Sequence, residues 1–256
     1  MKPAPPAAHR RAAARAIDAE GTDEARWLAA GLPDRLPHAS LPAGPVVVVA
    51  AHPDDEVLGF GGTIAALHSV GTPVHTLCLT DGEASHGAIG PRDASALKDR
   101  RRGELRAALA ELGAHSAPAH AGLPDTALDR CEDEAARHIG ALLDDAGAAL
   151  LVAPWSNDLH SDHEAAGRAA RSAARRSGVT LWSYPVWMWH WAHPQDPRVP
   201  WHRAAVLPLS PRALDRKKAA LARFTSQLEP RGDHLPPVLP PQEIAHHTRN
   251  FETVIL

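Results

Sequence analysis

The sequence of 256 residues has little of what several protein classes require. It has only two cysteines, which argues against a disulfide-stabilised secreted scaffold, and we expect Cys78 and Cys131 to be reduced thiols in the core. Uninterrupted apolar runs such as Val46–Ala51 are too short to span a bilayer. The formal net charge of -3 provides no basic surface for nucleic acid. No charged start followed by a long apolar core marks a secretory signal, so the expected location is the cytoplasm.

The domain organisation is predicted to be simple, because no Ser/Gly-rich or charge-dense linker divides the chain. A length of 256 residues is near the upper limit for one hydrophobic core. We predict an N-terminal extension over residues 1–44, rich in Ala, Pro and Arg, that packs on the domain and is frayed at its start. A helix is expected around Asp23 to Ala30. A single domain over residues 45–256 follows.

From Pro45 onward, short apolar segments alternate with segments of helical periodicity. The predicted strands are 46–51, 74–80, about 117–121, 149–154 and 180–184, and the predicted helices are about 61–70, 94–112, 132–145, 163–177 and 211–224. This alternation is typical of an α/β protein with a Rossmann-like, mostly parallel sheet and helices on both faces. The final segment, 249–256, has the pattern of a last strand or docking segment.

Polar residues follow three of the predicted strands. His52, Asp54, Asp55 and Glu56 follow the first strand, residues 80–83 (T-D-G-E) follow the second, and residues 155–163 follow the fourth. The carboxyl ends of parallel strands meet at one edge of an open sheet, where ligands bind. Neighbouring carboxylates beside an imidazole repel one another unless a cation lies among them, so this edge predicts a metal site.

The residue types at this edge suit zinc. A catalytic zinc site takes three protein ligands and keeps one position open. His52 and Asp55 are three residues apart, so one turn of chain aims both side chains the same way, and His163 can supply the third ligand. Asp54 is then adjacent but unligated, which suits a general base for a water that zinc activates. The same set of ligands accommodates iron(II) or another divalent metal.

The second motif, His160-Ser161-Asp162-His163, offers two further candidates. His160 could face the substrate from the opposite side and stabilise an oxyanion or protonate a leaving group. Asp162 could hydrogen-bond an imidazole and fix its tautomer. Structural alternatives stay open, because Asp162 is also a natural N-cap for a helix that begins at His163, and Pro53-Asp54 could be an ordinary turn or helix start.

These motifs, A-H-P-D-D-E at Ala51–Glu56 and H-x-D-H at His160–His163, resemble those of the PIG-L family, also called LmbE-like de-N-acetylases. The resemblance covers roughly residues 45–256, with Ser161 standing where many relatives carry Pro. It implies a Rossmann-like fold and metal-dependent hydrolysis of N-acetyl groups from amino sugars. It also implies roles for five residues: zinc ligands His52, Asp55 and His163, general base Asp54, and oxyanion-stabilising His160.

Other residues allow two interpretations each. Asp81 or Glu83 could grip sugar hydroxyls or merely hydrogen-bond their loop, and Arg101 could bind a substrate hydroxyl, carboxylate or phosphate or form a surface ion pair on its arginine-rich helix. The Trp-rich segment 182–201 could be a packed cover over the sheet edge or a platform for sugar rings, and exposed tryptophans near residue 190 could lie in a subunit contact. We expect the remaining histidines, including His246 and His247, at the surface.

The leading functional hypothesis is a zinc-dependent N-deacetylase that acts on a small N-acylated amino sugar or glycoconjugate, such as one containing N-acetylglucosamine. An amidase that cleaves a non-sugar or thiol-conjugate amide is the alternative. Phosphoester hydrolysis is disfavoured because the edge lacks additional bridging carboxylates and a cationic clamp. A non-catalytic metal- or nucleotide-binding module is suggested by Gly59-Phe60-Gly61-Gly62, but the carboxylates of Asp54 to Glu56 would repel a pyrophosphate.

Overall fold

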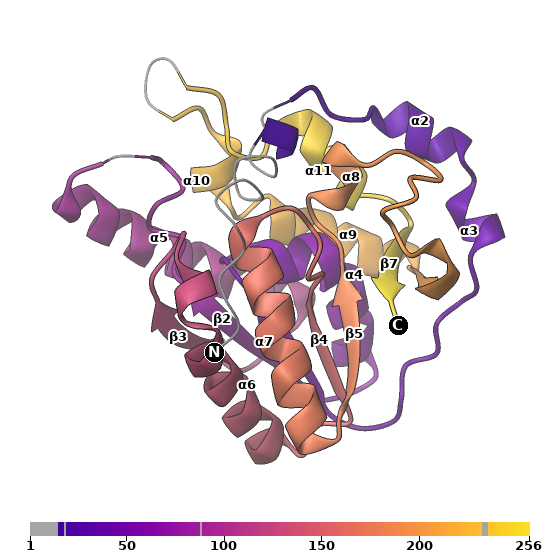
Figure 1. The fold of residues 1–256 in the computed structure, drawn as a ribbon, viewed down its shortest axis with the longest axis horizontal. Helices are drawn as coiled ribbons and strands as arrows, with labels where there is room; N and C mark the ends of the chain where they lie inside the picture. The colour runs from indigo at the N-terminus through magenta and orange to yellow at the C-terminus, as the bar shows by residue number, and fades with distance from the viewer. Residues whose placement is uncertain (1–14, 18, 88, 232–234) are drawn as a thin grey trace.

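The computed structural model describes residues 15–17, 19–87, 89–231 and 235–256 (Figure 1). Its strands are β1 Val46–Ala50, β2 Val74–Thr80, β3 Ala119–Leu123, β4 Leu150–Pro154, β5 Thr180–Tyr184, β6 Ala204–Pro208 and β7 Phe251–Ile255. The longer helices are α4 Asp55–Ser69, α5 Pro91–Leu112, α6 Glu132–Ala146, α7 Ser161–Ser177 and α9 Pro211–Leu221. The shorter helices are α2 Glu24–Ala29, α3 Leu32–Arg35, α8 Met188–Trp191, α10 Thr225–Leu228 and α11 Pro241–His247.

The seven strands form one sheet in the order β3-β2-β1-β4-β5-β7-β6. Strands β1 to β5 are parallel, whereas β7 runs antiparallel between β5 and β6. The strand order reverses between β1 and β4. In open α/β sheets the ligand crevice lies beyond the carboxyl ends of the strands at such a switch point. The topology therefore brings the residues after β1 and after β4 to one crevice.

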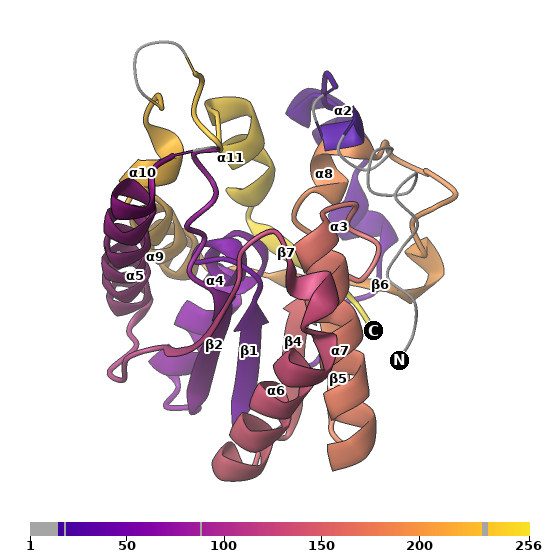
Figure 2. The same cartoon turned by 60° about the vertical axis from the view of Figure 1, so that its left-hand side comes forward.

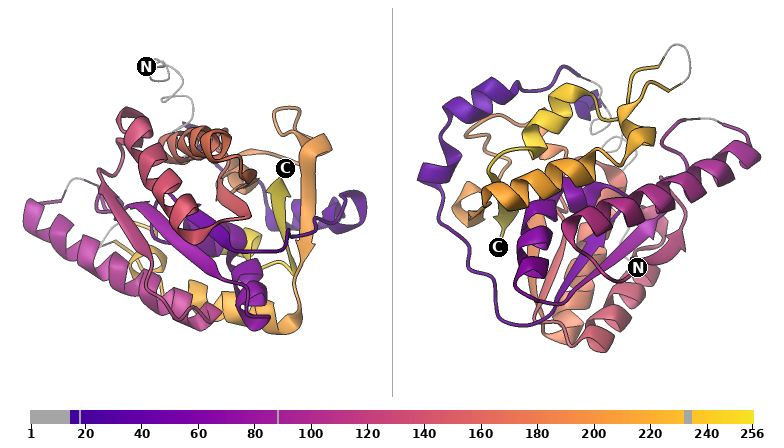
Figure 3. Two further views of the ribbon diagram at one scale, coloured as in Figure 1. Left: turned by 90° about the horizontal axis from the view of Figure 1, so that it is seen from below. Right: turned by 180° about the vertical axis from the view of Figure 1, so that it is seen from behind.

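Helices cover both faces of the sheet, with α4, α5 and α9 on one side and α6 and α7 on the other (Figures 2 and 3). Alternate residues of β1 and the residue after it pack into the two cores: Val46, Val48 and Ala50 face α4 and α5, and Val47, Val49 and Ala51 face α6 and α7. A strand buried on both faces must be apolar throughout, which explains the unbroken valine run. The predicted α/β fold is confirmed.

The main errors in the predicted elements lie where glycine or aromatic residues obscure the periodicity. Helix α4 begins at Asp55 rather than near Gly61, because Gly59, Gly61 and Gly62 weaken the helical pattern of its first turns. Two of these glycines permit close packing, since a Cβ on Gly59 would lie 2.0 Å from Tyr184 and one on Gly62 would lie 2.4 Å from Leu209. Strand β6 was not predicted.

Other boundaries differ by a few residues. Strand β3 spans 119–123 rather than 117–121, α7 begins at Ser161 rather than His163, and α9 ends at Leu221 rather than Phe224. Both cysteines are free, but only Cys78 is buried. Cys131 is a free thiol as expected, but it is only partly buried, because it lies at the N-cap of α6 and packs against the margin of the core.

The described part of the N-terminal extension packs closely on the rest of the protein. Trp27 is buried in a third apolar cluster with Trp189 and Phe251. Further along, Ala39 N donates to Val206 O and Val206 N donates to Pro37 O, both at 2.9 Å, so the extension pairs with the edge strand β6. The expected fraying at the start falls on residues 1–14, which lie outside the described residues. In the described chain no helix is both long and apolar enough to cross a membrane.

Candidate active site

The turn between β1 and α4 places a carboxylate at the end of the strand. Asp55 Oδ2 accepts hydrogen bonds from the backbone N–H groups of Ala51 at 3.0 Å and His52 at 2.9 Å. Asp55 is also the first residue of α4, where the helix dipole favours an anion. Burial raises the pKa of Asp55, but the nearby imidazoles of His163 and His52 outweigh burial and hold this pKa well below its ordinary value.

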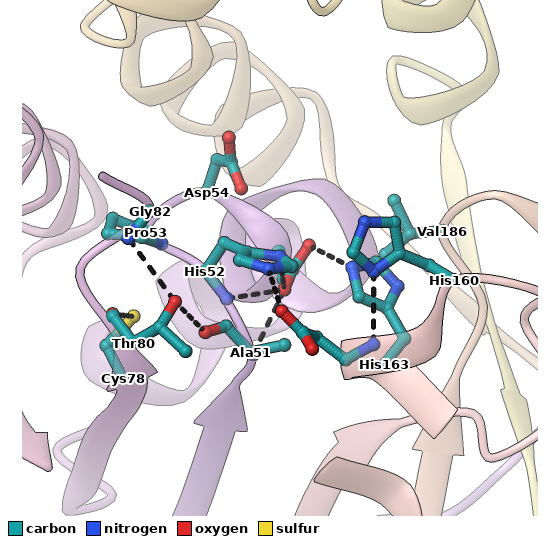
Figure 4. A network of polar contacts seen from close by, with 12 residues as sticks. Ala51, His52, Pro53, Asp54, Cys78, Thr80, Gly82, His160, His163 and Val186 are labelled. Atoms are coloured by element: carbon teal, nitrogen blue, oxygen red, sulfur yellow. Dashed lines mark hydrogen bonds and ion pairs between the residues drawn. The ribbon is translucent and has the colours of Figure 1, made fainter. Parts of the chain in front are cut away.

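Two imidazoles reach the Asp55 carboxylate from opposite sides of the switch point. His52 Nδ1 lies 3.5 Å from Asp55 Oδ2, and His163 Nε2 lies 3.1 Å from Asp55 Oδ1. His160 completes a group of three rings, with centroids 4.9 Å from His52 and 4.6 Å from His163 (Figure 4). The structure therefore brings together the three residues that the sequence proposes as metal ligands.

The other nitrogen of each imidazole is held by carboxylates. His163 Nδ1 lies 2.7 Å from Asp158 Oδ2, while His52 Nε2 lies 3.1 Å from Asp162 Oδ2 and 3.3 Å from Asp125 Oδ1. Carboxylates orient metal-binding histidines in this way. They hold the ring proton on the nitrogen that points away from the metal and leave the lone pair of the other nitrogen free to bind the metal. Here the nitrogens left free are those that face Asp55.

The donor set fits a divalent metal. The candidate ligands are two neutral nitrogen donors and one carboxylate, which suit zinc or iron(II), and each has an outer partner. Burial lowers the pKa of His163, but the carboxylates of Asp55 and Asp158 outweigh it and raise the pKa to about 9, as expected where negative charge surrounds a site for a cation. Ligand atoms of His52, His160 and His163 lie within 4.8 Å of one another, as do those of His52, Asp125 and Asp162.

Sequence reasoning missed Asp158 and Asp125. The fully buried Asp158 also accepts backbone hydrogen bonds from Trp187 at 2.9 Å and Met188 at 2.8 Å. Asp125 Oδ2 accepts one from the N–H of Ala84 at 2.8 Å. Asp158 lies in the polar segment after the fourth strand, and Asp125 lies two residues after Leu123, the true end of β3, so its position at the carboxyl end of a strand is the signal that indicates it.

Asp162 holds an imidazole and does not cap a helix. Its carboxylate is fully buried and accepts hydrogen bonds from the N–H groups of Thr126 at 2.8 Å and Leu128 at 3.2 Å, beside its contact with His52. The alternative interpretation of Asp162 as an N-cap was wrong, because α7 starts earlier and its N-cap is His160.

The N-cap geometry determines which nitrogen of His160 is protonated. His160 Nδ1 accepts the N–H of Asp162 at 3.3 Å. A neutral ring in this position therefore carries its proton on Nε2. Burial and the neighbouring imidazoles of His163 and His52 lower the pKa of His160 to about 3, so the ring is neutral at pH 7. His160 lines the pocket and can present a hydrogen-bond donor there.

Asp54 lies beside the candidate metal ligands and is paired with Arg101. Arg101 Nη2 donates to Asp54 Oδ2 at 2.9 Å and to Pro53 O at 3.2 Å, and Nη1 donates to Gly82 O at 3.0 Å. Burial raises the pKa of Asp54 to about 6 against the lowering effect of Arg101, with a further upward contribution from Asp55. Arg101 is 2% exposed, so the surface interpretation of this residue was wrong.

The structure does not bring Asp81 or Glu83 to the pocket. The Asp81 carboxylate forms ion pairs with Arg102 at 2.6 Å, Lys98 at 2.9 Å and His120 at 3.0 Å. Glu83 Oε1 accepts the N–H of Asp125 at 3.2 Å. Of the two interpretations offered by the sequence, the contacts favour structural hydrogen bonding over a grip on sugar hydroxyls: Asp81 ties its loop to α5 and β3, and Glu83 supports Asp125.

The candidate site opens into a pocket of about 240 Å³. Beyond the residues above, its lining combines polar Ser85, Thr126 and Gln227 with apolar Leu58, Val186, Trp187, Val238 and Leu239. Of the Trp-rich segment, only Trp187 lines this pocket. Trp189 is 4% exposed and packs in the third apolar cluster, and Trp187 and Trp191 are half-buried, so the expected exposure of these tryptophans was wrong. A subunit contact at this segment stays a prediction.

Fold and site together define a Rossmann-like α/β protein with a buried candidate metal centre of His and Asp residues at the topological switch point. The GlcNAc-PI de-N-acetylase (PIG-L) family matches residues 47–174, which is half of the chain. The protein belongs to this family. The matched range contains all the residues of the candidate metal centre.

The chain is also similar to proteins that are named as deacetylases. The chain is 33% identical over 168 residues to 1D-myo-inositol 2-acetamido-2-deoxy-alpha-D-glucopyranoside deacetylase of Mycobacterium sp. (strain KMS), a match that covers 56% of this chain and 53% of the relative. It is 32% identical over 180 residues to 2'-N-acetylparomamine deacetylase of Streptomyces fradiae, covering 60% and 61%. The chain thus spans about half to three fifths of the length of these relatives.

Solved structures share the fold. A conserved protein from Thermus thermophilus superposes with a TM-score of 0.55 at 29% identity, over 71% of this chain and 79% of that chain.

Proposed function

We propose that the protein is a metal-dependent N-deacetylase of an amino-sugar-containing small molecule, with zinc as the metal. The convergence of His52, Asp55 and His163 on one buried point, with Asp54 beside them, carries this proposal. Membership of the PIG-L family and the deacetylase names of the relatives support the same reaction and substrate class.

The bound ion would supply a Lewis acid that polarises the amide carbonyl and lowers the pKa of a water to about 7. Asp54, with its pKa of about 6, is mostly ionised at pH 7 and can accept a proton from the attacking water. The Arg101 guanidinium keeps its carboxylate in place. The Nε2–H group of His160 can donate to the carbonyl oxygen as negative charge develops on it.

Cleavage of the C–N bond then requires a proton on the departing nitrogen. Asp54 holds the proton taken from water and can deliver it, so the base of the first half becomes the acid of the second. The water oxygen ends in acetate and the amine is released. The geometry favours this reaction over phosphoester hydrolysis, because among the described residues Arg101 is the only Lys or Arg lining the pocket, and it is already paired with Asp54.

A combined metal and activity assay tests the proposal. The purified protein should contain stoichiometric divalent metal and release acetate from an N-acetylated amino sugar. Asp54→Ala should lower kcat by about 10² to 10⁴-fold with its metal content retained. Glu132→Gln is the matched control, because its carboxylate pairs with Arg168 away from the pocket. Full activity in Asp54→Ala would contradict the mechanism, and a metal-free protein that is fully active would contradict the proposal itself. Hydrolysis of only non-sugar amides would move the substrate to the alternative class.

A further inference from the structure

His190 joins three separate parts of the chain beside the pocket. Its Nε2 lies 2.9 Å from the carbonyl oxygen of Ala19, and its Nδ1 lies 2.5 Å from Glu243 Oε1 on α11. A carbonyl oxygen and an ionised carboxylate both accept, so these contacts favour the imidazolium form, and the hydrogen bond to Glu243 raises the pKa of His190 above its ordinary value. The residue is 9% exposed, which makes these contacts strong because water competes little for them. The expected surface position of this histidine is thus replaced by a buried junction.

The N-terminal segment closes over this junction. A Cβ on Gly21 would lie 2.4 Å from the His190 ring, so the chain passes directly over the imidazole where only glycine fits. Thr22 N donates to the His190 carbonyl at 2.8 Å. Trp27 Nε1 donates to the Trp189 carbonyl at 2.8 Å, and the two indoles meet edge to face at 5.0 Å. This segment therefore holds α8 through main-chain and side-chain contacts.

The same segment also holds α11. Glu24 accepts hydrogen bonds from Arg249 Nε at 2.7 Å and Nη2 at 2.5 Å, and lies 2.6 Å from His246 Nδ1. His246 is buried rather than exposed because of this contact, and His247 is buried beside it. We call residues 19–27 the N-terminal clamp. Through Glu24 and His190, the clamp fastens α8 and α11 to each other.

Four apolar residues of the pocket lining adjoin the clamped helices. Val186 and Trp187 directly precede α8, and Val238 and Leu239 lie just before α11; we call these four residues the apolar wall. His190 packs edge to face against Trp187, with centroids 6.0 Å apart and an interplanar angle of 79°. The clamp can therefore position the wall in two ways: through the ring contact between His190 and Trp187, and through the short segments that join the wall residues to α8 and α11.

The wall and the candidate metal centre come from different parts of the chain. The family match, 47–174, includes the candidate ligands and general base but neither the clamp nor the wall. We propose that the apolar wall is the specificity determinant of this site, that it favours an N-acetylated amino sugar carrying an apolar aglycone, and that His190 and Glu243 are positioning residues for it. This inference rests on the proposed function and adds the group attached to the sugar.

The physical reason is the apolar character of the four wall residues that line the pocket. A hydroxylated aglycone leaves its polar groups unpaired against Val186, Trp187, Val238 and Leu239, whereas an aromatic ring buries apolar area and stacks on Trp187. One well-buried apolar group changes kcat/KM by about tenfold to a few hundredfold. The wall must be held in place to provide this selectivity, because a wall that moves must be ordered again when the substrate binds.

The test compares two substrates, N-acetylglucosamine and its phenyl glycoside, by acetate release. The metal-loaded wild-type protein should prefer the phenyl glycoside by about tenfold or more in kcat/KM. Trp187→Ala should lose most of this preference. Glu243→Gln removes the charge of the His190 partner and should raise KM for the phenyl glycoside severalfold, with metal content unchanged. Glu24→Gln, which is closer to the surface, should act in the same direction. Glu132→Gln, which removes an ion pair between α6 and α7, should match the wild type.

Two results would overturn the inference while leaving the proposed function intact. One is a wild-type protein that deacetylates both substrates equally well. The other is an equal loss on both substrates in Glu243→Gln and Glu24→Gln, which is what a general loss of folded protein produces. Acetate release from neither substrate by fully metal-loaded protein would instead overturn the proposed function together with this inference.

Discussion

Replacing Asp158 with asparagine would exchange one of its two acceptor oxygens, which hold His163 and the backbone of residues 187–188, for an NH₂ group. Asp158 Oδ2 lies 2.7 Å from His163 Nδ1 and 2.9 Å from the backbone N of Trp187, and Oδ1 lies 2.8 Å from the backbone N of Met188. Asparagine has one oxygen, so its NH₂ group must face a donor on one side. If that donor is His163, the ring proton must move to Nε2. This is the nitrogen that faces Asp55, and once protonated it cannot bind a metal.

The expected magnitudes follow from these contacts. Loss of the carboxylate behind a metal-binding histidine lowers metal affinity by about 10 to 100-fold. This corresponds to about 1.4 to 2.7 kcal/mol of binding free energy. The metal-free protein should also unfold more easily by about 1 to 3 kcal/mol, because a buried donor loses its acceptor. The free energy of unfolding measured with saturating metal should therefore fall by more than the value measured without it.

Zinc titration of metal-free protein against a competing chelator measures the affinity, and urea unfolding with and without zinc measures stability. Glu132→Gln serves as the control, since it removes a carboxylate charge from an ion pair that is remote from the pocket. If Asp158→Asn binds zinc within about twofold of the wild-type value, far less than the loss expected for an orienting carboxylate, the reasoning is refuted. A loss of stability that is the same with and without zinc would show that Asp158 only supports the chain near residues 186–188.

Three further predictions concern other buried polar groups. In Gly82→Ala the new Cβ would lie 1.9 Å from Arg101 Nη1 at a backbone φ of +67°, so the guanidinium must move and release Asp54. We expect kcat to fall about tenfold or more with metal content unchanged. A wild-type kcat would rule out that Arg101 positions Asp54 for catalysis. Asp81→Asn should destabilise the protein by about 1 kcal/mol at pH 7, since its cationic partners are partly exposed. Burial raises the pKa of Asp81, but the three partners outweigh it and hold the pKa below its ordinary value, so the Asp81 contribution is present above about pH 4 and is lost as the pH falls further. Urea unfolding from pH 7 to pH 3 should show the difference from wild type shrinking, and a constant difference would contradict the ion-pair account. In Lys217→Met the fully buried Glu252 loses a partner at 2.6 Å, which should cost about 3 to 5 kcal/mol in urea unfolding. Lys217→Met/Glu252→Gln should regain part of that loss, and equal stability of the single and double variants would argue against an unpaired charge.

Local sequence pattern was sufficient for most of the α/β framework. The valine run of β1 is apolar because both of its faces are covered, and the periodicity of α5, α6 and α7 reflects one buried side per helix. The same local reasoning relates His52 to Asp55, since three residues of turning chain aim both side chains alike. The parallel order of β1 to β5 then brings residues after β1 and β4 together. The metal-binding and catalytic roles of these residues stay predictions for the assays above.

Only the tertiary structure decided which partner each buried polar side chain of the site has. The spacing of these residues in the sequence does not indicate their contacts. The pairs His52–Asp125 and Asp54–Arg101 join segments 47 or more residues apart. The contact between Asp158 and His163 depends on the irregular loop that connects them. The antiparallel β6–β7 pair and the clamp over His190 are likewise contacts between distant parts of the chain. The periodicity of apolar residues indicates which side of a helix or strand is buried and which faces solvent. The pairing of buried polar groups depends instead on how the whole fold is packed.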